Sequence, residues 1–155
     1  MERLRYPYGE ARDAPARQRG WNGGRILVVE DNFLFAELVC DFLRECKLVP
    51  VGPAFDVDKA LPMAREADLD GAVLDLNLRS GLSLPVCRAL NARSIPFLFL
   101  TGMNELSVIP VEYRGAPMIS KPFDTGELTA ALAGIMPVWT PPDPACPTLP
   151  AAWSH

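Results

Sequence analysis

Short runs of aliphatic and aromatic residues alternate with amphipathic stretches through the middle of this chain, and this alternation limits the possible folds more than any other feature. Runs such as residues 25–29 and 96–101 are short, apolar and typical of buried strands. Between such runs, as at residues 35–46, apolar side chains recur every three or four positions, which indicates one face of a helix. Strands that alternate with helices predict an α/β fold with a mainly parallel sheet.

Five strands are expected, at residues 25–29, 48–51, 71–75, 96–101 and 118–120, with Gly52 and Pro53 ending the second. Helices are expected after the first, second, third and fifth strands, and three residues are placed to cap the last three of them: Asp56, Ser83 and Asp124. After the fourth strand, Pro110 and Gly115 interrupt a weak pattern over residues 102–117. One turn of helix or a loop is expected there.

The two ends of the chain differ from this middle part. Residues 1–24 contain five arginines and no apolar periodicity, which is typical of a mobile leader. Residues 137–155 contain six prolines, too many to propagate a helix or a central strand, so this segment is expected to be a Pro-rich tail. A single domain is therefore predicted over residues 25–136.

Charge and composition exclude several classes of function. The chain has 15 basic and 19 acidic residues and a net charge of −4, which disfavours binding to the phosphate backbone of a nucleic acid. The apolar runs are far shorter than the roughly 20 residues that a membrane helix needs, and no signal-peptide region is present. A cytoplasmic protein is expected, with neither nucleic acid nor membrane as a partner. The only histidine is His155, so histidine-based catalysis is excluded.

Polar side chains stand where the predicted strands end. Because the carboxyl ends of parallel strands meet at one edge of a sheet, these residues are expected to lie close together. Each one alone has an ordinary structural explanation, as a helix cap, a strand residue or a surface lysine. The set comprises three acids, one hydroxyl and one ammonium: Glu30, Asp31, Asp75, Thr101 and Lys121.

Such a set suits phosphoryl chemistry. Three neighbouring carboxylates repel one another and favour a hard cation with oxygen ligands, such as Mg²⁺. A carboxylate can then act as a nucleophile toward phosphorus and form an aspartyl phosphate. The ammonium of Lys121 and the hydroxyl of Thr101 would stabilise the phosphoryl oxygens.

Four short motifs in order, ILVVEDN, LDLN, FLTG and SKPF, resemble the receiver domain of bacterial two-component response regulators over residues 25–136. This resemblance implies a flavodoxin-like, doubly wound sheet of five parallel strands in the order 2-1-3-4-5. By the same resemblance, Asp75 is the phosphoacceptor and Asp31 a direct metal ligand. Glu30 acts largely through metal-bound water, and the main-chain carbonyl of Asn77 completes the protein's share of the metal shell. Lys121 contacts the phosphoryl group, and the peptide bond before Pro122 is often cis in the family.

Two departures from the family pattern bear on signalling. The family usually has Tyr or Phe three residues before the lysine, and this sequence has Met118, so the usual aromatic switch is absent. Residues 96–102 resemble a subgroup of single-domain receivers with a Phe-Ala-Thr-Gly signature, although Leu100 replaces the alanine. Without an aromatic switch, residues 102–117 are expected to be the moving part.

The resemblance implies a single-domain response regulator that takes a phosphoryl group onto Asp75 from a sensor histidine kinase or a histidine phosphotransfer protein. It would not be an enzyme in the ordinary sense, although it participates in its own phosphorylation and dephosphorylation. Its output would be protein–protein signalling, phosphoryl relay or a phosphate sink, as a monomer or homodimer. The Pro-rich tail leaves no room for an output domain within residues 137–155.

Two alternatives remain open at this stage. One is a pseudo-receiver, an interaction module that keeps the fold and never uses the site; Met118 favours this alternative, and the intact acids and Lys121 argue against it. The other is a flavin or nucleotide carrier on the same fold. A bound phosphate there would need a Ser-, Thr- or Gly-rich loop after the first strand, whereas this chain has Glu30 and Asp31.

Overall fold

The computed structural model describes residues 23–102 and 109–136. The tail predicted at residues 137–155 lies outside the described residues, and so does the leader predicted at residues 1–24, apart from its last two glycines. The amide of Gly23 donates to the carbonyl of Lys47 over 2.9 Å, and the carbonyl of Gly24 accepts from the amide of Val49 over 2.7 Å.

The centre of the molecule is a parallel sheet of five strands in the order β2-β1-β3-β6-β7. The strands are β1 (Arg25–Val29), β2 (Val49–Ala54), β3 (Gly71–Leu74), β6 (Phe97–Thr101) and β7 (Met118–Ser120). Because β6 and β7 are the fourth and fifth parallel strands along the chain, the predicted flavodoxin-like order 2-1-3-4-5 is confirmed.

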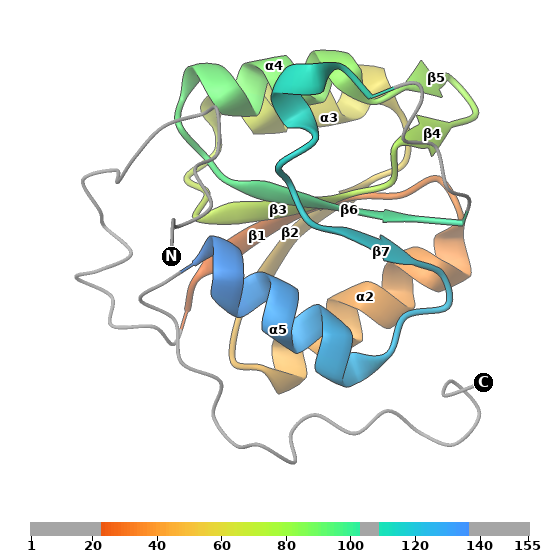
Figure 1. The fold of residues 1–155 in the computed structure, drawn as a ribbon, viewed down its shortest axis with the longest axis vertical. Coiled ribbons are helices and arrows are strands. Elements are labelled where there is room, and N and C mark those ends of the chain that lie inside the picture. The colour runs from red at the N-terminus through yellow and green to blue at the C-terminus, as the bar shows by residue number, and fades with distance from the viewer. Residues whose placement is uncertain (1–22, 103–108, 137–155) are drawn as a thin grey trace.

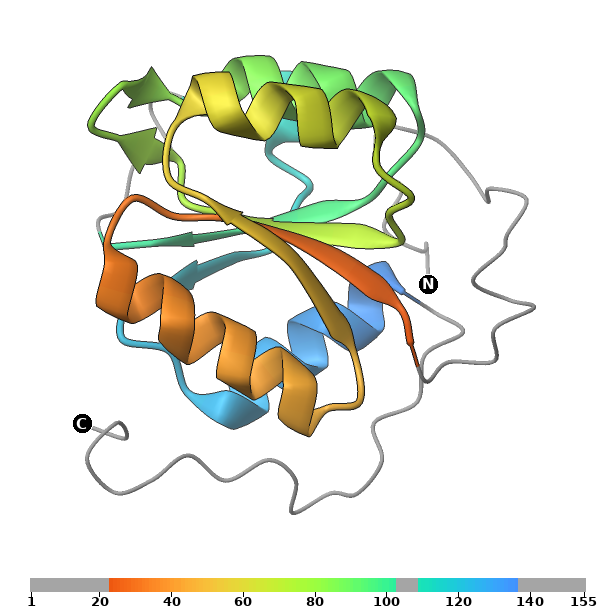
Figure 2. The ribbon, with the colours of Figure 1, turned by 180° about the vertical axis from the view of Figure 1, so that it is seen from behind.

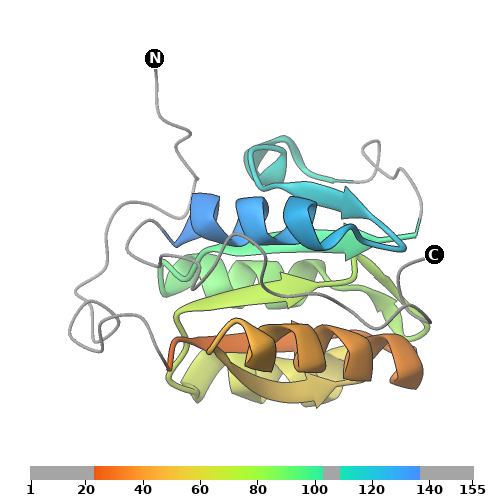
Figure 3. The ribbon, with the colours of Figure 1, turned by 90° about the horizontal axis from the view of Figure 1, so that it is seen from below.

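Two helices cover each face of this sheet. Helices α3 (Val57–Glu66) and α4 (Leu84–Ala92) lie on one face, and α2 (Phe33–Glu45) and α5 (Thr125–Ile135) lie on the other (Figures 1 and 2). Figure 3 shows the second pair from outside the sheet. This layering places the loops that follow β1, β3, β6 and β7 at one end of the sheet, where ligands bind in open α/β folds.

Each face of the sheet has its own apolar core, because neighbouring residues of a strand point to opposite faces. In β1, Leu27 and Val29 pack toward α3 and α4, whereas Ile26 and Val28 pack toward α2 and α5. A central parallel strand is therefore apolar throughout, which is why its sequence reads as a continuous hydrophobic run.

Three helices begin with a side-chain cap. The Asp56 carboxylate accepts from the amide of Lys59 over 2.8 Å, and the Asp124 carboxylate accepts from the amide of Glu127 over 2.9 Å, so both predicted caps are confirmed. The Asn32 side chain caps α2 by accepting from the amide of Phe35 over 2.9 Å. A cap of this kind fixes the direction in which the chain leaves a strand and enters the following helix.

Ser83 precedes α4 as predicted, but its hydroxyl makes no capping bond. The second residue of α4 is Pro85, which has no N–H to donate, and the amide of Val86 is taken by the Ser83 carbonyl over 2.9 Å. The prediction that the Ser83 side chain caps α4 was therefore wrong. Its hydroxyl is buried without a hydrogen-bond partner.

Strand β2 is longer than predicted. It continues through Gly52 and Pro53 to Ala54, with a shift of register opposite Leu27 to Val29. This continuation is possible because β2 lies at an edge of the sheet, where a proline costs few ladder bonds. The extension matters for the site, since the Ala54 carbonyl accepts from the amide of Glu30 over 3.0 Å.

The loop after β3 contains a small antiparallel hairpin that the sequence pattern does not predict, formed by β4 (Asn77–Leu78) and β5 (Gly81–Leu82). Of the segment predicted to be one turn or a loop, residues 103–108 lie outside the described part. The rest contains a single 3-10 turn, Val111–Tyr113, in agreement with that prediction. This turn is anchored, because Ile109, Tyr113 and Ala116 are buried.

Three of the four cysteines, Cys40, Cys46 and Cys87, are buried and free, and Cys146 lies outside the described residues. Burial raises the pKa of the Cys87 thiol to about 12, so it packs as a small apolar side chain. Among residues 23–102 and 109–136, no helix has the length and apolar character needed to cross a membrane.

Candidate functional site

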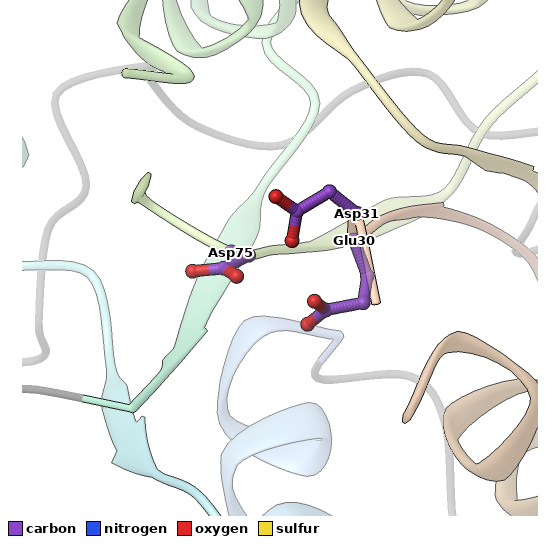
Figure 4. Close-up of side chains that lie close together, drawn as sticks. All are labelled: Glu30, Asp31 and Asp75. Carbon is purple, nitrogen blue, oxygen red and sulfur yellow. The ribbon is translucent and has the colours of Figure 1, made fainter. Parts of the chain in front are cut away.

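Three carboxylates meet where β1 and β3 end. Glu30 and Asp31 follow β1 directly, and Asp75 follows β3, the strand hydrogen-bonded beside it. One carboxylate oxygen of each lies within 4.8 Å of the others, and Figure 4 shows the three side chains gathered at this end of the sheet. The structure thus brings together the three acids that the sequence analysis grouped.

Glu30 is the most buried of the three, at 3% exposure. Its Oε1 lies 2.6 Å from the Nζ atom of Lys121, and its Oε2 accepts from the amide of Asn32 over 3.0 Å. Burial raises the pKa of Glu30 to about 7, even though the bonds from Lys121 and Asn32 act in the opposite direction. The nearby charge of Asp75 adds to the increase.

Lys121 connects two of the acids. Its Nζ atom lies 2.6 Å from Oε1 of Glu30 and 3.0 Å from Oδ2 of Asp75, and 4.7 Å from the centre of the Phe35 ring. Burial alone would lower the pKa of Lys121, but the hydrogen bonds to Glu30 and Asp75 outweigh it and raise this pKa. The ammonium is therefore held charged inside the site.

The backbone around Lys121 fixes its direction. The Lys121 amide donates to the carbonyl of Thr101 over 2.8 Å, which joins the ends of β6 and β7, and the bond between Lys121 and Pro122 is cis. Thr101 is 2% exposed and ends β6, as predicted. The structure thus places Thr101 and Lys121 at the same end of the sheet as the acids.

Asp75 and Asp31 are held by the loop that follows β3. The Asn77 amide donates to Oδ1 of Asp75 over 3.2 Å. The Arg79 amide donates to Oδ2 of Asp31 over 2.8 Å, and the guanidinium Nε of Arg79 lies 3.6 Å from the same oxygen. Asn77 is thus next to the acid cluster.

Sequence reasoning missed three residues that touch the site: Asn32, Phe35 and Arg79. The spacing from Asn32 to the first apolar face of α2 is a recognisable cap signal. Phe35 was seen as part of that apolar face, but not as a neighbour of Lys121. Arg79 gives no signal, because its position depends on a two-residue hairpin that has no periodic pattern.

The family described as response regulator receiver domain matches residues 26–133, which is most of the chain. The chain belongs to this family. Receiver domains are signalling components of two-component systems; they bind Mg²⁺ at an acidic pocket and interact with histidine kinases or phosphotransfer proteins.

Solved receiver structures agree with this assignment. The domain is 39% identical to SdrG of Sphingomonas melonis Fr1, with a TM-score of 0.65 over 74% of this chain and 97% of that one. It is 28% identical to the non-phosphorylated HemR receiver domain of Leptospira biflexa, with a TM-score of 0.63 over 76% and 98% of the two chains.

Among curated proteins, the domain is similar to regulators that are longer. It is 36% identical over 118 residues to the phosphate regulon transcriptional regulatory protein PhoB of Klebsiella pneumoniae, covering 72% of this chain and 51% of PhoB. It is 35% identical over 115 residues to the DNA-binding response regulator MtrA of Mycobacterium leprae, covering 68% and 48%. The chain thus spans about half the length of these relatives.

Proposed function

We propose that this receiver is a single-domain response regulator that accepts a phosphoryl group on Asp75, with Mg²⁺, from a sensor histidine kinase or a histidine phosphotransfer protein. It then signals through protein–protein contact, or serves as a relay or sink for the phosphoryl group. The observation that carries this proposal is the position of Lys121, whose Nζ atom lies 2.6 Å from Glu30 and 3.0 Å from Asp75 beside three clustered carboxylates.

The surroundings favour Asp75 over the other acids as the nucleophile. Glu30 is buried deeper, and its raised pKa makes it a poorer nucleophile near neutral pH. Asp31 is engaged by Arg79. Asp75 has one oxygen next to Lys121 and the other next to the Asn77 amide. Both are hydrogen-bond donors that could stabilise the negative charge of a phosphoryl group as it is transferred to Asp75.

The step is a transfer from nitrogen to oxygen. An oxygen of the Asp75 carboxylate forms a bond to phosphorus as the bond from phosphorus to the donor's imidazole nitrogen breaks. The imidazole leaves with that electron pair and is neutral when its other nitrogen carries a proton. Lys121 and the Thr101 hydroxyl would stabilise the phosphoryl oxygens, and Lys121 would remain beside the new acyl phosphate.

The donor set fits Mg²⁺, because three carboxylates with one nearby ammonium leave excess negative charge and offer oxygen ligands only. Asp31, Asp75 and the main-chain carbonyl of Asn77 would hold the ion directly, and Glu30 through water. When bound, the ion would neutralise charge on the acids and on the phosphoryl oxygens.

One comparison supports the single-domain proposal. This chain covers 97% of the solved SdrG chain, but only 51% of PhoB and 48% of MtrA. The net charge of −4 further disfavours direct binding of nucleic acid by this chain, and a cytoplasmic location follows from the proposed role.

Met118 favours one other candidate function, a pseudo-receiver that acts as a phosphorylation-independent interaction module. Met118 begins β7 and packs, half-buried, against the core on the α3 and α4 side. Met118 has no aromatic ring whose orientation could change when the site is phosphorylated. Such a module would bind its partner equally well with and without a phosphoryl group.

The test is to incubate the protein with Mg²⁺ and a small phosphoramidate donor and to read the intact mass. One phosphoryl group is expected on the wild type and none on Asp75→Asn, since an amide is not a nucleophile here. Asp41→Asn is the matched control, because Asp41 is an exposed carboxylate of α2, paired only with Arg44 in the described contacts. Equal labelling of Asp75→Asn and the wild type would reject the assignment.

A further inference from the structure

The tip of the β4–β5 hairpin carries a cation that contacts the acid cluster. Arg79 sits at this tip, and both its amide and its guanidinium approach Oδ2 of Asp31, at 2.8 Å and 3.6 Å. The two contacts differ in character. The amide is part of the backbone, whereas the Arg79 side chain is 83% exposed and free to turn toward solvent.

The tip is held in place from both sides. The hairpin pairs Asn77 with Leu82 and Leu78 with Gly81. Ser80, which follows Arg79 at the tip, accepts a hydrogen bond through its hydroxyl from the amide of Val57, at the start of α3, over 3.2 Å. Arg79 is therefore tethered beside Asp31, and a tethered group competes at a high effective concentration.

The cations of the site divide the acids between them. Lys121 contacts Glu30 and Asp75, and Arg79 contacts Asp31. Lys121 is 20% exposed and bonded to both of its partners, so it stays in the site, whereas the guanidinium of Arg79 is held by one long contact. A Mg²⁺ ion bound at Asp31 would share that carboxylate with the guanidinium of Arg79. Two cations on one carboxylate repel each other, so the guanidinium would leave.

We propose that Arg79 is a built-in competitor of the divalent cation at Asp31, and that it sets the Mg²⁺ concentration at which the receiver can accept a phosphoryl group. This inference rests on the proposed function, because it assumes that Mg²⁺ binds at the acid cluster. It adds a positioning residue that acts on the site through Asp31. The guanidinium swings out when the ion binds and returns when the ion leaves.

The experiment is a calorimetric Mg²⁺ titration of the full chain at low salt. Arg79→Ala is expected to bind Mg²⁺ about two- to fivefold more tightly than the wild type, the range that an exposed ion pair contributes. Arg79→Lys keeps the charge and is expected to lie near the wild type. Arg44→Ala removes the same charge from the exposed pair with Asp41 in the last turn of α2, so its affinity should not change.

A second readout distinguishes electrostatic competition by Arg79 from a change in the structure of the loop caused by the substitution. If the effect is electrostatic, the affinity ratio between Arg79→Ala and the wild type falls toward one as added KCl rises from about 0.02 M to about 0.5 M. A ratio that does not depend on salt would overturn the proposal. Unchanged or weaker Mg²⁺ binding by Arg79→Ala would overturn it as well, since Arg79 would then have no effect on the ion or would help to hold it.

The outcomes also distinguish this inference from the proposed function. Asp31→Ala is expected to weaken Mg²⁺ binding by removing a direct ligand. If the wild type and Asp31→Ala both fail to bind Mg²⁺, the metal site itself is rejected, and the role of Arg79 with it. If the wild type binds and Asp31→Ala does not, but Arg79→Ala equals the wild type, only the role of Arg79 is rejected.

Discussion

Lys121 and Asp75, which lie 46 positions apart in the sequence, are joined by a 3.0 Å contact between Nζ and Oδ2. This contact and the second one, to Glu30, outweigh the effect of burial on the pKa of Lys121, so they keep the ammonium charged and directed at the acids. The contact links the ends of β3 and β7, two strands that are not neighbours in the sheet. Lys121 thus reaches across the end of β6.

Lys121→Met is expected to slow phosphoryl acceptance from a small donor by about a hundredfold, because one preorganised donor to the developing charge is lost. Rapid-quench sampling followed by intact mass measures this rate. Lys59→Met, on the exposed surface of α3, is the matched control and should leave the rate unchanged. An equal rate in Lys121→Met would show that the ammonium does not stabilise the transferring group.

Glu30 predicts a pH dependence of stability in Mg²⁺-free protein. Its pKa is raised from 4.5 to about 7 in the folded state, so between these pH values the folded protein keeps a proton on Glu30 that the unfolded chain has released. The resulting stabilisation is complete below about pH 4.5 and is lost as the pH rises to about 7. Relative to Glu30→Gln, the free energy of unfolding of the wild type should fall by on the order of 2–3 kcal/mol across this interval.

Urea unfolding at several pH values, with a chelator present, measures this difference. Mg²⁺ is expected to restore part of the lost stability above pH 7, since it takes the place of the proton. A difference between wild type and Glu30→Gln that stays constant from pH 4.5 to pH 7 would contradict the raised pKa of Glu30.

Gly52 is expected to tolerate no side chain. Its φ of 100° disfavours other residues, and a Cβ would lie 2.9 Å from the Ala54 nitrogen and 3.2 Å from the Val28 oxygen, both backbone atoms. Gly52→Ala should therefore lower the free energy of unfolding by about 2–4 kcal/mol.

Gly81→Ala is the control for that substitution. An alanine at its φ of 126° would also be strained, as at Gly52, but no atom lies within 4 Å of the added Cβ. A loss of about 1 kcal/mol is expected, from the backbone alone. Equal losses in the two variants, measured by urea unfolding, would show that the close approach at Gly52 relaxes at no cost.

The segment after β6 is expected to respond most to phosphorylation. It follows Thr101, whose carbonyl binds the Lys121 amide, so a movement of Thr101 toward a phosphoryl group displaces the start of this segment. Amide exchange with and without a phosphoryl mimic should show its largest protection change at residues 102–117. The described part of this segment includes residues 109–117. A change confined to α2 and α3 would reject this route.

Much of the sheet and of the acid cluster could be predicted from the sequence, for a physical reason. Strands buried on both faces need continuous apolar runs, and the first polar residues after such runs must lie at the sheet's end. Glu30, Asp31 and Asp75 were located in this way. The predicted roles of these residues stay predictions until phosphoryl transfer is measured.

What the sequence could not show depends on neighbours in space. The strand at residues 48–51 was expected to stop at Gly52, but at a sheet edge the chain continues to Ala54, which binds the Glu30 amide. Ser83 lost its capping role because Pro85 removes a donor. The Arg79 contact with Asp31 depends on the β4–β5 hairpin, which has no periodic pattern in the sequence.

The two edges of the sheet have a consequence for how the protein behaves at high concentration. β2 contains Pro50 and Pro53, and β7 has only three residues. An open edge attracts other chains when it offers a long row of unpaired N–H and C=O groups, and neither edge here does so. The most apolar strands, β1, β3 and β6, lie inside the sheet with both sides paired. The order of the strands thus keeps the most apolar strands of the described chain from pairing with other copies of the protein.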